Sequence, residues 1–243
     1  MISASHLTKT FGRLQALDDF SATLERGRSV LLIGPNGSGK TTFIKCILGL
    51  VLPDKGTLTL DGQDLSRPDL RRHIGYMPQI GRFPDHLKAG QILDMMREIR
   101  RGTYHRLDED LIEAFEIHRF AHKPARTLSG GMRQKLGACL AFLFDPDVLI
   151  LDEPTAGLDP VAAEILKEKV LESRDRNKLI LITSHILSDL DEITTDLMHL
   201  IDGRLQFHRP IGELMEEHGE TRLSRIVVRI MKQTASTPAT SQP

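Results

Sequence analysis

The stretch that decides the fold is Gly34-Pro-Asn-Gly-Ser-Gly-Lys-Thr41, which lies between an apolar run at 30–33 and a helix-like segment at 42–49. Its glycines let the backbone turn tightly with inward N–H groups, and Lys40 can reach the outer phosphates of a ligand. The Thr41 hydroxyl suits a magnesium ion, and the start of the following helix favours the same anion. The residues expected to hold a nucleoside triphosphate here are Gly34, Pro35, Asn36, Gly37, Ser38, Gly39, Lys40, Thr41 and Thr42.

Composition narrows the classes of protein that fit. With 243 residues, the chain can form one large α/β domain or a core domain with a smaller subdomain. Its 32 basic and 33 acidic residues give a net charge of -1, which provides no electrostatic footprint for nucleic acid or an anionic membrane. We expect no signal peptide, because the N-terminus lacks a basic region followed by an apolar core, and no apolar run approaches the ~20 residues that span a bilayer. We therefore expect any membrane role to depend on a partner.

Strand and helix patterns alternate along most of the chain. The expected strands span residues 2–7, 20–24, 30–33, 56–62, 74–77, 147–152, 179–184, 197–201 and 205–208. The expected helices span residues 42–49, 89–101, 108–115, 132–144, 160–174 and 187–193. The first two strands suit an antiparallel cap, and the stretch at 81–126 reads as a helical insertion because it has no convincing strand. The later strands, separated by helices, predict a parallel sheet that binds its ligand at the carboxyl ends of the strands.

Two adjacent acids, Asp152 and Glu153, end an apolar strand. Successive side chains of a strand point to opposite faces, so Asp152 can hold the magnesium shell while Glu153 points toward a water that attacks the last phosphate. A base beside a metal-bound triphosphate is what hydrolysis requires. A solvated acidic turn is the alternative, and the complete phosphate loop upstream favours the catalytic pair.

The stretch Leu128-Ser-Gly-Gly131 precedes an apolar helix and carries the second strong signal. Ser129 is a natural N-cap, and Gly130 and Gly131 let a ligand approach the backbone, so the helix start favours an anion. Taken alone, the stretch could be an ordinary helix cap. Its place in the order of the motifs favours a functional role.

That order resembles the ATP-binding cassette ATPases. The phosphate loop, Gln79, the Leu128–Gly131 signature, Asp152-Glu153, the Ala156-Gly-Leu-Asp159 loop and His185 follow the family's sequence of motifs. The resemblance covers roughly residues 1–210 and implies a P-loop NTPase fold of the α/β class, with a parallel-sheet core, an antiparallel β subdomain and a helical signature subdomain at about 81–145. We expect residues 211–231 to form a short helical extension and residues 232–243 to be disordered.

The resemblance also implies roles for single residues. Two such domains would pack head to tail, with Ser129, Gly130 and Gly131 of one copy serving the nucleotide of the other. Gln79 would touch the magnesium site and report to the transport partner, and His185 would contact the last phosphate. The catalytic residues expected on this basis are Glu153, His185 and Gln79, and the metal-binding residues are Thr41, Gln79 and Asp152.

Two further positions follow from the same resemblance. Asp159 would couple the two nucleotide sites of the dimer. Phe11 matches the aromatic position that stacks on adenine, although it could instead be a core residue of the first hairpin. The segment at 80–88, after Gln79, is the expected contact surface for a membrane partner.

These observations predict the ATPase subunit of a membrane transporter that uses ATP and Mg²⁺. We expect a homodimer under separately encoded transmembrane permease subunits, held peripherally on the cytoplasmic inner face of the cell membrane, with no nucleic-acid partner. Met132, in place of the usual glutamine, resembles exporter-like branches for drugs, polysaccharides and copper, above all the copper-processing system that matures nitrous-oxide reductase. The alternatives are a soluble cassette ATPase acting on nucleic acid or the ribosome, and a P-loop kinase, in which the signature would have no purpose.

Overall fold

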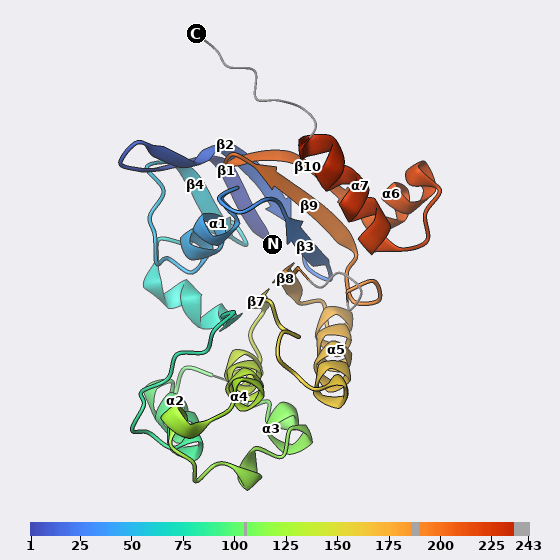
Figure 1. Ribbon diagram of the computed structural model, residues 1–243. Coiled ribbons are helices and arrows are strands. Elements are labelled where there is room, and N and C mark those ends of the chain that lie inside the picture. The colour runs from blue at the N-terminus through green and yellow to red at the C-terminus, as the bar shows by residue number, and fades with distance from the viewer. Residues whose placement is uncertain (105, 186–189, 236–243) are drawn as a thin grey trace.

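The buried strand β3 (Ser29–Ile33) lies inside a six-stranded sheet of order β10-β9-β3-β8-β7-β6 (Figure 1). The computed structural model describes residues 1–104, 106–185 and 190–235. The other strands of this sheet are β6 (Ile74–Met77), β7 (Val148–Asp152), β8 (Leu179–Thr183), β9 (Asp196–Ile201) and β10 (Arg204–Pro210). All neighbours are parallel except β10, which pairs antiparallel with β9. The parallel sheet predicted from the alternating pattern is therefore confirmed.

A second, antiparallel sheet has the order β2-β1-β4-β5. Its strands are β1 (Ile2–Phe11), β2 (Leu14–Leu24), β4 (Lys55–Leu60) and β5 (Gln63–Asp64). Helix α1 (Lys40–Ile47) packs against it, and the rings of Phe20 and Phe43 lie 4.5 Å apart. Along β3, Val30 and Leu32 belong to this core whereas Leu31 and Ile33 belong to the core under the helices, as the period of two dictates. One short strand thus joins both cores.

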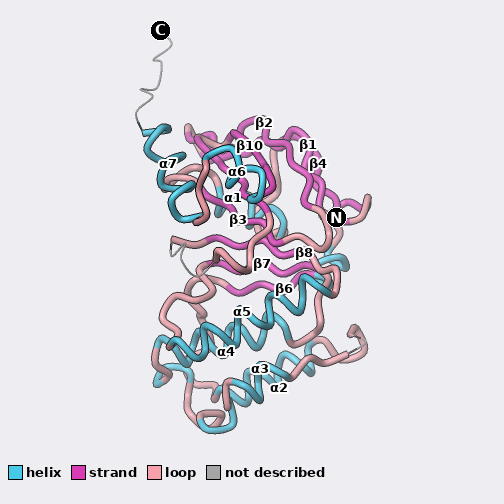
Figure 2. Tube along the Cα trace, turned by 90° about the vertical axis from the view of Figure 1, so that its right-hand side faces the viewer, coloured by secondary structure: helices cyan, strands magenta, loops and turns pink. Residues whose placement is uncertain are grey.

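The remaining helices cover the other face of the parallel sheet. They are α2 (Ala89–Ile99), α3 (Asp110–Ala114), α4 (Gly130–Phe142) and α5 (Pro160–Asp175), with short 3₁₀ turns at Ile117–Arg119 and Ala125–Thr127. A further 3₁₀ turn, Pro68–His73, contributes Leu70 to the core beneath the antiparallel sheet. Figure 2 shows α4 and α5 against the sheet and α2 and α3 beyond them. Helix α4 can approach β6 closely because Gly75 has no side chain, since a Cβ there would lie 2.1 Å from the Ala141 carbonyl oxygen.

The C-terminal part folds back on the sheet as two helices, α6 (Ile211–His218) and α7 (Leu223–Ala235). Helix α7 thus continues past residue 231, where we expected the extension to end, and 236–243 lie outside the described residues. We expected a helix at 187–193. Its first three residues, 187–189, lie outside the described part of the chain, and residues 190–193 form a turn. Within the described ranges, no helix is both long and apolar enough to cross a lipid bilayer.

A buried ion cluster joins α5 to the start of α3. The Lys169 Nζ lies 2.7 Å from Asp108 Oδ2, 2.6 Å from Asp110 Oδ2 and 3.1 Å from Glu172 Oε2. The side chains of Lys169 and Asp108 are 5% and 2% exposed. Burial opposes the charge of Lys169, but the hydrogen bonds to the carboxylates outweigh it, and the pKa of Lys169 is raised. The cluster fastens the helical insertion to the core.

We expect Lys169→Met to destabilise the fold by about 3 kcal/mol, because it leaves the Asp108 carboxylate buried without its partner. Urea unfolding followed by circular dichroism measures the change. Lys167→Met is the matched control on the same helix, since Lys167 pairs with the exposed Glu164 and such pairs are worth about 0.5 kcal/mol. An equal decrease in the free energy of unfolding in the two variants would show that the buried cluster stabilises the fold no more than the exposed ion pair does.

Candidate functional site

The phosphate loop folds around its own lysine. Lys40 Nζ donates hydrogen bonds to the carbonyl oxygens of Gly34 at 2.7 Å and Pro35 at 3.0 Å, which draws the loop into a ring between β3 and α1. Gly39 precedes α1 with φ 103°, and no side chain caps the helix. The first N–H groups of α1 are therefore left to an anionic ligand.

Two glycines of this loop are required by close contacts as well as by conformation. At Gly34, with φ 153°, a Cβ would lie 2.2 Å from the Leu200 carbonyl oxygen. At Gly39, with φ 103°, it would lie 2.4 Å from the Ala16 carbonyl oxygen. Any side chain at either position would push the loop away from β9 or β2.

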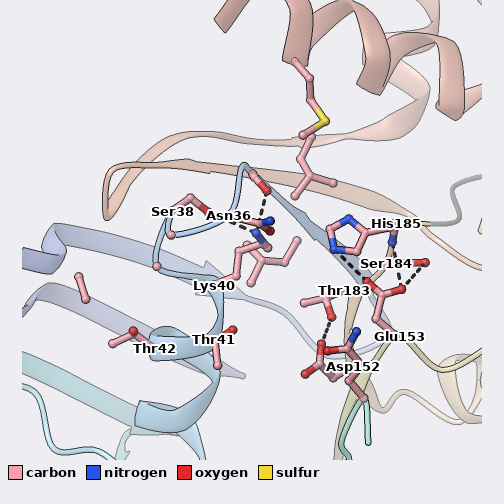
Figure 3. Close-up of a pocket in the computed structure, with 18 of the residues that line it drawn as sticks. Asn36, Ser38, Lys40, Thr41, Thr42, Asp152, Glu153, Thr183, Ser184 and His185 are labelled. Carbon is pink, nitrogen blue, oxygen red and sulfur yellow. Dashed lines mark hydrogen bonds and ion pairs between the residues drawn. The ribbon is translucent and has the colours of Figure 1, made fainter. Parts of the chain in front are cut away.

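The phosphate loop opens into a cavity of about 350 Å³ at the carboxyl ends of β7 and β8 (Figure 3). Of the residues predicted from the sequence, it brings together Phe11, Gly34, Asn36, Gly37, Ser38, Gly39, Lys40, Thr41, Thr42, Gln79, Asp152, Glu153 and His185. Pro35 is not part of the wall and contributes its carbonyl to Lys40. Phe11 is 47% exposed, which rules out the alternative of a core phenylalanine.

The two adjacent acids at the end of β7 have different surroundings, but strand alternation is not the reason, because Glu153 follows the last strand residue, Asp152, and has φ 53°. Asp152 accepts a hydrogen bond from the Thr183 hydroxyl. The Glu153 side chain, 8% exposed, accepts hydrogen bonds from His185 N at 3.1 Å and Ser184 Oγ at 3.4 Å, and His185 Nε2 lies 3.4 Å from its other oxygen. Figure 3 shows these partners converging on Glu153. The sequence analysis missed Thr183 and Ser184, although they directly precede His185.

The cavity offers a set of oxygen ligands that fits a magnesium ion. The Thr41 hydroxyl, the Gln79 amide and the Asp152 carboxylate all line it, and hard cations of this kind prefer oxygen. Burial lowers the pKa of the nearby Lys40, against the opposing effect of Asp152 and Glu153. An anionic ligand in the cavity would therefore favour the charged form of Lys40.

The signature stretch lies elsewhere. Ser129 is the N-cap of α4 and accepts a hydrogen bond from Met132 N at 3.3 Å. Ser129 and Gly130 are exposed, and neither they nor Gly131 line the cavity of their own chain. The structure therefore does not bring this predicted nucleotide contact to the phosphate loop.

Asp159 ties the start of α5 to the signature helix. Its carboxylate accepts a hydrogen bond from Ala162 N at 2.9 Å and pairs with Lys135 Nζ at 2.9 Å. The hydrogen bond from Lys135 is the main reason that the pKa of Asp159 is lowered. This residue, predicted to couple two sites, thus already contacts α4 within one chain.

Gln134, on α4, is a contact that the sequence analysis missed. Its buried side chain donates from Nε2 to the carbonyl oxygens of Glu153 at 3.0 Å and Pro154 at 3.3 Å. Glu153 itself has φ 53°, a left-handed conformation unusual for glutamate. The signature helix thus supports the backbone of the catalytic candidate. Gln134 stands between Arg133 and Lys135, so the sequence offered no signal that its side chain is buried.

Helix α7 supplies the other unpredicted part of the cavity. Val227 and Met231 line it together with the phosphate loop. We expected a short extension there, and nothing in its sequence indicated where it would pack.

Comparisons with known proteins agree with this geometry. A family model described as ABC transporter matches residues 17–156. The Nod factor export ATP-binding protein I of Ralstonia nicotianae is 32% identical over 209 residues, which cover 84% of this chain and 65% of that protein. The ABC transporter ATP-binding protein YtrB of Bacillus subtilis is 35% identical over 220 residues, or 90% of this chain and 75% of YtrB. The chain thus spans slightly less than two thirds of the first relative.

A solved structure of an ATP-binding subunit of an ABC transporter has the same fold. It superposes with a TM-score of 0.84 at 28% sequence identity, and the match covers 94% of this chain and 98% of that one.

We expect Gln134→Leu to slow hydrolysis of the bound triphosphate about tenfold, because the Glu153 and Pro154 carbonyls lose their donor and the backbone of Glu153 shifts. Nucleotide affinity should stay the same, since the phosphate loop is untouched. Steady-state kinetics on folded protein separates kcat from KM. Cys139→Ala, on the same helix and equally buried, is the control that should leave kcat unchanged. Equal kcat in all three proteins would contradict a positioning role.

Proposed function

The chain belongs to the ABC transporter ATPases, and from this premise we propose that two copies work head to tail beneath separately encoded membrane subunits. The observation that carries the proposal is the position of the signature, in which Ser129 and Gly130 are exposed and which does not line the cavity of its own chain. Ser129, Gly130 and Gly131 can serve a nucleotide only if a second copy presents one to them. Each ATP would then lie between the phosphate loop of one copy and the signature of the other.

We propose the following roles for the residues that line the cavity. Lys40 and the start of α1 hold the phosphates, and Phe11 stacks on adenine. Thr41, Gln79 and Asp152 would hold the magnesium ion, which neutralises charge on the phosphates when bound. Glu153 accepts a proton from the attacking water, while His185 N keeps its carboxylate in position.

The same contacts suggest how closure of the dimer reaches the membrane. Asp159 holds Lys135, and Gln134 holds the backbone of Glu153, so α4 is joined to the hydrolytic residues from two sides. A change at the nucleotide would move α4 and, with it, the rest of the helical insertion. Gln79 touches the same cavity and leads into the segment at 80–88.

That segment borders a groove suited to a partner. The groove, of about 280 Å³, lies between β6, α2 and α4, and its walls include Tyr76, Phe83, Met96 and Arg100. Ile80, beside it, is 66% exposed. An apolar floor with a basic rim fits a short cytoplasmic segment of the permease that carries apolar and acidic residues.

Our proposal for the direction of transport rests on similarity to known proteins. The relatives include a protein named for Nod factor export, and we extend an export role to this chain on that ground. The copper-processing system remains a prediction from the sequence. We place the protein on the cytoplasmic side of the membrane, bound through its permease.

The alternative, a soluble cassette acting on nucleic acid or the ribosome, has less support because the chain has no excess of basic residues, its net charge being -1. ATPase assays of the purified chain, alone and with its neighbouring membrane subunit in nanodiscs, distinguish the two. Stimulation by the membrane subunit supports the transporter. A salt-sensitive gain in rate with RNA or DNA, and none with the membrane subunit, would favour the alternative.

We expect Glu153→Gln to bind ATP but to hydrolyse it at least about a hundredfold more slowly, because the amide cannot accept the proton of the attacking water. The uncleaved ATP should trap the closed dimer, which size-exclusion chromatography with light scattering detects. Adding Ser129→Arg should abolish the dimer while leaving ATP binding intact, since the signature lies outside its own cavity. A dimer that survives this second change would rule out the head-to-tail arrangement.

We expect Ile80→Asp to remove at least about half of the stimulation by the membrane subunit and to leave basal ATPase activity unchanged, because the charge opposes burial of this exposed side chain. Leu52→Asp is the control, since Leu52 is similarly exposed, at 62%, and lies away from the groove. Full stimulation of the Ile80 variant would place the docking surface elsewhere.

A further inference from the structure

Helix α7 carries one apolar stripe that continues beyond the protein core. Leu223, Ile226, Val227, Ile230 and Met231 follow the spacing i, i+3, i+4, i+7, i+8, which places them on one face. The first four are at most 8% exposed, whereas Met231 is 37% exposed. The stripe is therefore buried everywhere except at its last position.

The exposed end of this apolar stripe lies at the proposed nucleotide cavity. Val227 and Met231, one helical turn apart, line that cavity with Gly37, Lys40 and His185. Figure 1 shows α7 beside β9 and β10, and Figure 3 shows a helix in its colour above the phosphate loop. Helix α7 is thus the wall that faces the loop.

We propose that Met231 contacts the bound nucleotide and that α7 closes the cavity over the phosphate loop. The inference rests on the proposed use of this cavity for ATP and adds a binding residue from the C-terminal extension, beyond the region at 17–156 that matches the family model. A thioether adapts to irregular surfaces, and the part of the chain that the structure describes leaves Met231 37% exposed. A nucleotide in the cavity covers it.

Closure by an apolar side chain also strengthens the polar contacts beneath it. Removing water from above the loop lowers the local dielectric constant, so the attraction between Lys40 and the phosphates increases. In turn, a bound nucleotide stabilises the docked position of α7.

The test uses the full-length chain, which contains no tryptophan. Met231→Trp places a single fluorophore at the proposed contact, and Val228→Trp places one on the same helix at a side chain that is 47% exposed and does not line the cavity. Titration with Mg-ADP should change the emission of the first variant saturably and leave that of the second unchanged. Equal responses, or none while nucleotide binds, would overturn the proposal.

A second pair of variants measures affinity. Met231→Ala should weaken binding of a fluorescent ADP analogue about fivefold, through loss of an apolar contact, and Val228→Ala should change it less than about twofold. Unchanged affinity in both would contradict the contact while leaving nucleotide binding, and so the proposed function, intact. Absence of binding to the unmodified chain would instead refute the assignment of the cavity, and the role of Met231 with it.

Discussion

The structure depends on one constraint, the need to hold the Lys40 ammonium group against backbone carbonyl oxygens of its own loop. Lys40 is half-buried and donates to the carbonyl oxygens of Gly34 and Pro35, so the loop must curve tightly around it. That curvature requires positive φ values at Gly34 and Gly39, where a Cβ would also collide with carbonyl oxygens of neighbouring strands. The loop therefore lies in close contact with β9 at Gly34 and with β2 at Gly39. The position of the phosphate loop therefore depends on the packing of both sheets.

The helical insertion shares an apolar core with the parallel sheet, and a few polar contacts also join the two. Lys169 holds Asp108, Lys135 pairs with Asp159, and Gln134 reaches the carbonyl of Glu153. Such contacts have defined geometry, so they transmit a displacement better than apolar packing, which tolerates sliding. Two of the three meet the segment that follows Glu153. A movement of α4 therefore cannot leave the hydrolytic end of the cavity unaffected.

Much of this could be read from the sequence because the motifs are local. The phosphate loop, the strand that ends in Asp152 and the fold class each follow from a short run of residues whose chemistry and period agree. Gln134 and Met231 could not be found in that way, since each acts across a contact between distant segments. The two-residue strand β5 was missed because two residues have no period. Phe11 needed the structure to show that its ring is exposed.

The division of the motifs over the surface has a consequence for how the protein can work. One chain carries a complete phosphate loop and a complete signature, yet the first opens into the cavity and the second faces solvent. A single copy can therefore bind a nucleotide without contacting it through its own signature, whereas two copies in the proposed head-to-tail symmetry would place a signature on each of two nucleotides. Helix α7 belongs to the same chain as the phosphate loop. It could therefore close over a bound nucleotide before a second copy binds. Under the two proposals, nucleotide capture and dimer closure would be separate steps, and the C-terminal extension would act on the first.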